Sequence, residues 1–168
     1  VPRKNGKTEW AAGVAHLALA RLGVIGGEVY SIAATTDQAG IVFNAALSMV
    51  AHSPALADIY ETRKKSLYCP ALHTVFRPLS VNAHGKHGLK CLVLIGDEAH
   101  EWKSADLYEF VRQSMGLWAE PLEWIISTGD KPEGYGHELW DESEKIAEGS
   151  LDDPETLVDH AADNAKSI

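Results

Sequence analysis

The sequence has few cysteines, no long apolar run and little positive charge, and each shortage narrows the classes of protein it can belong to. Its two cysteines, Cys69 and Cys91, lie far apart and form no CxxC pair, which argues against a disulfide framework. No stretch of about 18 apolar residues occurs and no signal peptide is visible, so neither a membrane helix nor secretion is expected. A reducing, cytoplasmic setting fits this composition best.

Positive charge is scarce. The chain has 15 Lys and Arg against 24 Asp and Glu, a formal net charge of −9, and such an excess of negative charge opposes binding to nucleic-acid phosphates. The compact basic run is Arg63-Lys64-Lys65, and a solvated surface is the simpler interpretation of it. If the protein meets DNA, a local basic patch or parts outside this chain must make the contact.

With 168 residues, 45% of them hydrophobic, the chain can bury one core and is expected to form one domain. Apolar spacing and cap signals predict helices over 6–22, from Asp37, after Ser53 and after Ser104, with a last helix entered at 153–154. Strands are predicted over 29–34, 74–78, 92–95 and 124–126, with loops over 82–88 and 129–136.

Strands that alternate with helices predict an α/β fold, in which a parallel sheet lies between two layers of helices. The run 92–95 is continuously apolar, which is typical of a parallel strand buried on both faces. The strand over 124–126 is also expected to be buried, and Trp10 and Trp124 are expected in the core.

A phosphate-binding signal stands at the start of the first predicted helix, where Asn5-Gly6-Lys7-Thr8 leads into it. A nucleotide's phosphates need backbone N–H groups at a helix N-terminus, a lysine for the β- and γ-phosphates and a hydroxyl for Mg²⁺. Gly6, Lys7 and Thr8 supply these in order. The usual pattern also has a glycine five residues before Gly6, where Val1 stands instead, so this motif alone does not decide the function.

Two adjacent carboxylates, Asp97 and Glu98, follow the apolar strand 92–95. The carboxyl end of a buried strand is where open α/β sheets bind ligands. In a Walker B arrangement the first carboxylate holds Mg²⁺ and the second polarises the attacking water as a general base. An acidic turn is the plainer alternative, but together with Lys7 and Thr8 the pair favours an Mg²⁺-dependent ATPase.

A third signal, Ser127-Thr128-Gly129, follows the strand over 124–126. Small hydroxyl side chains beside a phosphate site can sense the γ-phosphate and couple hydrolysis to the following loop. Ser-Thr-Gly is also an ordinary turn, so this signal gains its weight from its place after the other two. His100, just beyond the carboxylates, is expected to be hydrogen-bonded beside the site rather than catalytic.

Together these motifs resemble the ATPase domain of the large terminase of tailed phages, the motor that packages viral DNA. The resemblance lies in segments 1–8, 34–39, 96–100, 121–129 and 148–154, in that order, and spans almost the whole chain. In that family an arginine or lysine inside the phosphate loop replaces glycine-rich sequence, as in Val1-Pro-Arg-Lys-Asn-Gly-Lys-Thr8. The resemblance implies a three-layer P-loop NTPase of the additional-strand class, similar to RecA and helicase folds.

The resemblance also implies a role for each matching residue. Binding of ATP would fall to Asn5, Gly6, Lys7, Thr8, Asp97, Ser127 and Thr128. Among these, Thr8 and Asp97 would hold Mg²⁺, while Ser127 and Thr128 would form the coupling motif. Glu98 would be the catalytic base, and Arg3 would stabilise charge on the γ-phosphate in the transition state.

Further expectations concern partners and domains. Double-stranded viral DNA, a portal protein and a small terminase subunit would be the partners of a homo-oligomeric ring, working in the host cytoplasm during virion assembly and not at a membrane. Residues 1–150 would form the ATPase domain without the strand that precedes its P-loop. Residues 151–168 would form a helix leading towards a nuclease domain outside this chain, so no DNA cleavage is expected from it.

Two other functions stay open. Asp97-Glu98-Ala99-His100 is also the DEAH signature of certain helicases, although residues 1–4 and 127–129 depart from the motifs of those enzymes. A truncated terminase fragment that folds but does not turn over ATP is the second alternative.

Overall fold

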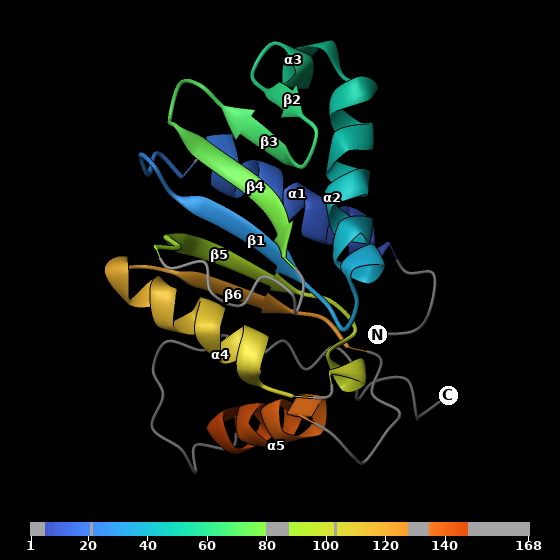
Figure 1. The fold of residues 1–168 in the computed structure, drawn as a ribbon, viewed down its shortest axis with the longest axis vertical. Helices are drawn as coiled ribbons and strands as arrows, with labels where there is room; N and C mark the ends of the chain where they lie inside the picture. The colour runs from blue at the N-terminus through green and yellow to red at the C-terminus, as the bar shows by residue number, and fades with distance from the viewer. Residues whose placement is uncertain (1–5, 21, 80–87, 103, 128–134, 148–168) are drawn as a thin grey trace.

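A computed structural model describes residues 6–20, 22–79, 88–102, 104–127 and 135–147, which form a six-stranded sheet between two layers of helices (Figure 1). The helices are α1 (Lys7–Ala20), α2 (Thr36–Ala51), α3 (Pro54–Ala57), α4 (Asp106–Gln113) and α5 (Tyr135–Ala147), with short 3₁₀ turns η2 (Ala99–Glu101) and η3 (Ser114–Leu117). The predicted three-layer α/β architecture is therefore confirmed. Among the residues just given, no helix is both long and apolar enough to cross a membrane.

The sheet has the strand order β2-β3-β4-β1-β5-β6. Its parallel part consists of β4 (Thr74–Leu79), β1 (Glu28–Ile32), β5 (Cys91–Gly96) and β6 (Leu122–Ile125). An antiparallel hairpin of β2 (Glu61–Arg63) and β3 (Ser66–Cys69) extends the sheet beyond β4. The sequence analysis missed this hairpin because its strands are short and its turn lacks an Asn-Gly or Asp-Gly signal.

The core has two parts, one on each face of the sheet. Alternate residues of β1 and β5 point to opposite faces, so Val29 and Val93 pack beneath α1 and α2, while Tyr30 and Leu94 pack beneath α4. Every residue of β5 is buried, which confirms the prediction of a strand covered on both sides. Cys69 and Cys91 are both free and buried.

Several predictions at the edges of elements are wrong. Trp10 is 68% exposed because it lies on the side of α1 that faces away from the sheet. Trp124 is 38% exposed because, within the described sheet, β6 is an edge strand whose alternate residues are not covered by a helix. The first helix ends at Ala20 and leaves Leu22 exposed.

Other differences concern helix starts. Ser104 does not cap α4; the N-cap is Ala105, and the Ser104 hydroxyl donates to Asp106 Oδ2 instead. Helix α5 begins at Tyr135, so its first two residues fall within the loop predicted over 129–136. The predicted helix over 151–168 and most of the predicted loop over 82–88 lie outside the described residues.

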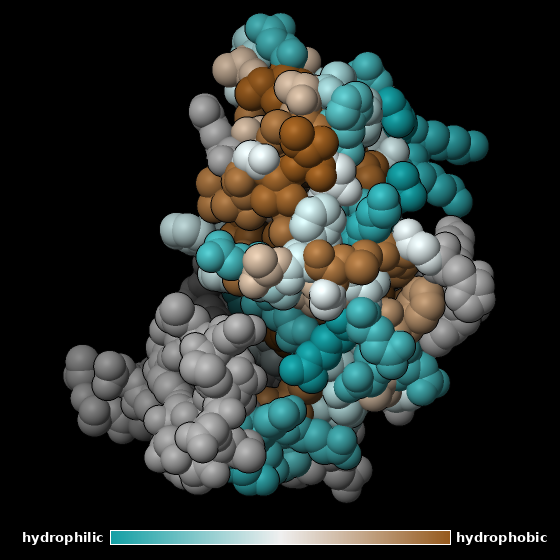
Figure 2. All heavy atoms as spheres, turned by 90° about the vertical axis from the view of Figure 1, so that its left-hand side faces the viewer, coloured by the Kyte–Doolittle hydropathy of each residue, from teal (hydrophilic) through white to brown (hydrophobic). Residues whose placement is uncertain are grey.

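The two edges of the parallel strands differ in chemistry. Exposed large apolar side chains precede or begin the strands at their amino ends, including Leu22 and Ile25 before β1 and Leu117 and Leu122 near the start of β6. Figure 2 looks from the left-hand side of Figure 1, towards these amino ends, and shows hydrophobic residues gathered over its upper half. The charged and hydroxyl side chains singled out above follow the carboxyl ends of β5 and β6 instead.

Gly96, the last residue of β5, has no room for a side chain. A Cβ added there would lie 2.7 Å from Ile125 Cδ1 and from Trp102 Cη2. Because overpacking forces the surrounding side chains to move, we expect Gly96→Ala to lower the free energy of unfolding by about 2 kcal/mol.

The matched control is Gly13→Ala, since Gly13 lies inside α1 with open space around the added Cβ. There alanine should raise the free energy of unfolding by about 0.8 kcal/mol through its helix propensity. Urea unfolding of both variants measures the difference, and a Gly96→Ala protein as stable as wild type would contradict the packing described here.

Candidate functional site

The carboxyl ends of the parallel strands form the polar edge of the sheet. β1 leads into α2, β5 leads into Asp97 and Glu98, and β6 leads into Ser127. The N-terminus of α1 belongs to the same edge, since the charge of Lys7 acts on Asp97. Figure 1 shows the arrowheads of β1, β5 and β6 pointing to the right-hand side, where α2 begins.

The start of α1 has the features of a phosphate-binding helix end. Gly6 has a φ of 69°, a conformation that favours glycine, and Lys7 and Thr8 are the first two residues of the helix. Among the residues that the structure describes, the buried ammonium nitrogen of Lys7 has no hydrogen-bond partner. Because a buried, unpaired cation is costly, this arrangement fits an anionic ligand. Arg3 and Asn5 lie outside the described residues.

Asp97 is a buried carboxylate at the end of β5, only 8% exposed. Burial raises the pKa of Asp97, and the neighbouring charge of Glu98 raises it further, while Lys7 acts in the opposite direction. Its backbone is held in the sheet, since its N–H donates to Ile32 O and its carbonyl accepts from Trp102 Nε1 at 3.1 Å. A partly desolvated carboxylate in a fixed position is suited to holding a cation.

Glu98 adopts an unusual backbone conformation, with a φ of 48°. A non-glycine residue in the left-handed region costs about 1–3 kcal/mol and is found most often at functional sites. Its backbone N–H donates to Asp97 Oδ1 at 3.0 Å, and its side chain, 33% exposed, reaches His100. The turn therefore separates the two carboxylates: Asp97 is buried, and Glu98 is accessible to water.

The end of β6 is bound to the end of β5 and the turn after it by three hydrogen bonds from backbone N–H groups. Ile126 N–H donates to Gly96 O at 2.8 Å, Ala99 N–H donates to Ile126 O at 3.1 Å, and His100 N–H donates to the side-chain Ser127 Oγ at 3.2 Å. These bonds bring Ser127 beside His100, which in turn contacts Glu98. Thr128 lies outside the described residues.

The sequence analysis did not predict that Gln38, in the segment 34–39, pairs with Glu101. Gln38 Nε2 donates to Glu101 Oε2 at 2.7 Å, and the Gln38 backbone N–H donates to Thr35 Oγ1, the N-cap of α2. The two side chains are 63 residues apart, and no local pattern in a sequence reports such a pair. Only the cap at Thr35 could have been read from the chain.

The chain's own residues fit a nucleotide with a divalent cation. The unpaired Lys7 ammonium and the start of α1 suit phosphates, and the Asp97 carboxylate with the Thr8 hydroxyl suits Mg²⁺. Within the described ranges, no group of three His, Cys, Asp or Glu side chains could hold a metal ion. Magnesium shared with substrate phosphates needs only one or two carboxylates from the protein.

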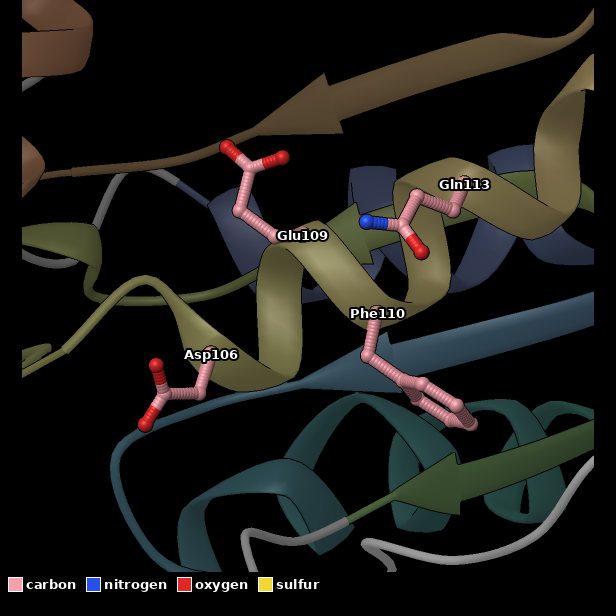
Figure 3. A pocket seen from close by; sticks show the side chains of 4 residues that line it. All are labelled: Asp106, Glu109, Phe110 and Gln113. Carbon is pink, nitrogen blue, oxygen red and sulfur yellow. The ribbon is translucent and has the colours of Figure 1, made fainter.

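A hollow lies on the outer side of α4, lined by Asp106, Glu109, Phe110 and Gln113. Figure 3 shows that these side chains spread along the helix rather than converge on one point. Its two carboxylates would repel phosphates. The polar edge of the sheet is therefore the better candidate for nucleotide chemistry.

The comparisons with known proteins show the family and the fold of this chain. The family model described as "Terminase large subunit, ATPase domain" matches residues 1–147. The terminase large subunit of Enterobacteria phage HK97 is 33% identical over 135 residues, which cover 76% of this chain and 26% of that protein. This chain therefore spans about a quarter of the length of that curated relative.

Solved structures show the same fold. The crystal structure of the HK97 bacteriophage large terminase superimposes with a TM-score of 0.78 at 28% identity, over 88% of this chain and 32% of that one. The ATPase domain of the Thermus phage P74-26 large terminase gives 0.64 at 23% identity, over 81% of this chain and 60% of that one, a likeness of fold alone. Since the family model covers nearly the whole chain, this protein belongs to the family of terminase large subunit ATPase domains.

Proposed function

We propose that this chain is the ATP-hydrolysing core of a motor that packages viral DNA. The observation that carries the proposal is the buried Lys7 ammonium, which stands at the N-terminus of α1 within electrostatic reach of Asp97 and has no hydrogen-bond partner in the described part of the chain. Phosphates at this position would give the cation charge-assisted hydrogen bonds. Membership of the terminase ATPase family supports ATP as the nucleotide.

In this proposal, Lys7 and the first N–H groups of α1 hold the phosphates, and Gly6 allows the backbone to approach them. The Thr8 hydroxyl and the Asp97 carboxylate hold Mg²⁺. The metal ion would supply positive charge that offsets the charge developing on the phosphates. Glu98, accessible to water beside this pair, accepts a proton from the attacking water.

Four further residues have proposed roles. Ser127 sits at the end of β6 beside Glu98, which supports a part in sensing the nucleotide. The resemblance alone suggests that Thr128 acts with Ser127, that Asn5 contacts the nucleotide, and that Arg3 stabilises charge on the γ-phosphate. These three lie outside the described residues.

The domain assignment is also a proposal. Residues 1–150 would form the ATPase domain, and the family match over 1–147 supports that boundary. Residues 151–168 would lead towards a nuclease domain, and this chain is not expected to cleave DNA. The portal protein, the small terminase subunit, the ring of copies and the host cytoplasm are expected from the family.

A test of the proposed activity is direct. Binding of Mg-ATP by calorimetry and release of phosphate should both be detected with this chain. Failure to bind ATP would favour the alternative of an inactive fragment. Unwinding of duplex DNA would revive the helicase alternative, which the family match disfavours.

We propose that duplex DNA binds the side of the sheet formed by the β2–β3 hairpin and β4. The chain has a net charge of −9, yet its segment 62–96 contains six Lys and Arg and no Asp or Glu. Within it, Lys64 and Lys65 form the exposed turn between β2 and β3. The strand register places Arg63, Tyr68 and Arg77 on the face away from α1 and α2.

These side chains have the chemistry that phosphate backbones attract. Arg63 stacks over the ring of Tyr68 at 3.9 Å and pairs with Glu61, so it is held in place, while Lys64, Lys65 and Arg77 are exposed. Positive side chains on one surface release counterions from DNA when they neutralise its phosphates. The hairpin face could therefore bind duplex DNA despite the negative charge of the whole chain.

Replacing Lys64, Lys65 and Arg77 together by alanine should weaken binding to duplex DNA and make it less dependent on salt. Each lost phosphate contact should reduce the slope of log K against log salt by about 0.9, so the triple variant should lose about 2.7. ATP turnover without DNA should not change.

Lys145→Ala on α5 is the matched control, because it removes a positive charge from another part of the surface. DNA binding should be measured across a series of salt concentrations for all three proteins. Equal slopes for wild type and the triple variant would exclude this face from DNA binding.

A further inference from the structure

One side chain, His100, joins two parts of the proposed site. Its Nδ1 lies 3.2 Å from Glu98 Oε2 and 3.2 Å from Ser127 Oγ, and its backbone N–H also donates to Ser127 Oγ. The imidazole side chain is only 14% exposed. It therefore contacts the proposed general base at the end of β5 and the proposed coupling serine at the end of β6 at the same time.

The far side of the ring faces Glu101. Nε2 lies 3.9 Å from Glu101 Oε1, and Glu101 accepts a hydrogen bond from Gln38 at the start of α2. Thr35, the N-cap of α2, in turn donates to Gln38 Oε1 at 3.1 Å. Side chains held by such outer contacts keep one orientation, which a catalytic arrangement needs.

The contacts of Nδ1 suggest where the imidazole carries its hydrogen. A carboxylate oxygen accepts hydrogen bonds, and a serine hydroxyl can accept as well as donate. The proposal below therefore places a hydrogen on His100 Nδ1, which lies 3.2 Å from both Glu98 Oε2 and Ser127 Oγ. A hydrogen bond to a charged acceptor is stronger than a neutral one.

We propose that His100 is a positioning residue, which sets the orientation of the Glu98 carboxylate according to the position of Ser127. This rests on the proposed function, in which Glu98 is the general base. Glu98 is one-third exposed, and its contact with His100 directs the carboxylate towards Ser127 at the end of β6. Movement of Ser127 at the end of β6 would shift the imidazole of His100 and, through it, the carboxylate of Glu98. The rate of hydrolysis and the position of the segment after β6 would then influence each other.

The variants that test this differ in where they place a donor. His100→Asn puts an amide nitrogen near the position of Nδ1, His100→Gln puts it near Nε2, and His100→Ala has none. We expect kcat to fall about tenfold in His100→Ala and in His100→Gln, with the KM for ATP unchanged. His100→Asn should retain most of the wild-type kcat.

A second measurement does not depend on turnover. Nitrogen-15 NMR of the imidazole in the nucleotide-free chain should show a hydrogen on Nδ1, and Ser127→Ala should reduce the population of that tautomer. A hydrogen on Nε2 in wild type, or a kcat of His100→Asn as low as that of His100→Ala, would overturn the proposal. If the wild-type protein shows no ATP turnover, the proposed function is rejected instead. The NMR result alone would then show whether His100 carries its hydrogen on Nδ1.

Discussion

Glu98→Gln should stop ATP turnover while leaving ATP bound. The amide has almost the same size and keeps an oxygen that can accept from His100, but it cannot take a proton from water. General bases contribute roughly 10²–10⁴-fold to a rate, so phosphate release should fall by at least about 100-fold. The dissociation constant for Mg-ATP should stay within about twofold of wild type, because uniform binding is not affected.

Glu120→Gln is the matched control for this variant. Glu120 is exposed in the segment before β6, away from the polar edge of the sheet, and its replacement removes the same single charge. Its turnover should equal that of wild type. Equal turnover in Glu98→Gln and wild type would remove Glu98 from the mechanism, whereas loss of both binding and turnover would assign it to the binding site.

Lys7→Ala should greatly weaken the binding of ATP without lowering the free energy of unfolding. Hydrogen bonds to charged groups contribute about 1.5–3 kcal/mol, so losing the ammonium should weaken ATP binding by about 100-fold. The nucleotide-free protein should be at least as stable as wild type, because the buried Lys7 ammonium has no hydrogen-bond partner among the described residues. Most binding-site substitutions give no such combination of lost affinity and retained stability.

Lys7→Met separates the charge of this side chain from its packing. Methionine keeps a similar chain of atoms, so it should bind ATP as poorly as alanine does and unfold at an equal or higher urea concentration. Calorimetric titration with Mg-ATP and urea unfolding measure the two effects. A large loss of stability in both variants would mean that Lys7 is a structural residue, and the phosphate site would need another cation.

Where local chemistry decides the structure, the sequence was sufficient. The apolar run 92–95 predicted a strand buried on both faces, and every residue of β5 is buried. Ser53 and Pro54 predicted a helix start, and α3 begins at Pro54 with Ser53 as its N-cap. Signals of this kind depend on residues within one turn or one strand, so they can be read from consecutive letters.

Predictions that depended on distant neighbours were less reliable. Both Trp10 and Trp124 were expected in the core because tryptophan is largely apolar, yet Trp10 faces away from the sheet and Trp124 lies on its edge strand. The β2–β3 hairpin was missed because its short strands depend on pairing with β4. Exposure and edge pairing are properties of the assembled sheet, and no single segment contains them.

The sequence by itself determined the order of the motifs, and with it the family and the expected chemistry of Lys7, Asp97 and Glu98. Only the tertiary structure decided how these groups act on one another. It buried the Lys7 ammonium with no hydrogen-bond partner from the described ranges of the chain, and it brought His100 to Ser127 across 27 residues and Gln38 to Glu101 across 63. The physical reason is that parallel strands gather their carboxyl ends at one edge, so side chains far apart in the chain meet there.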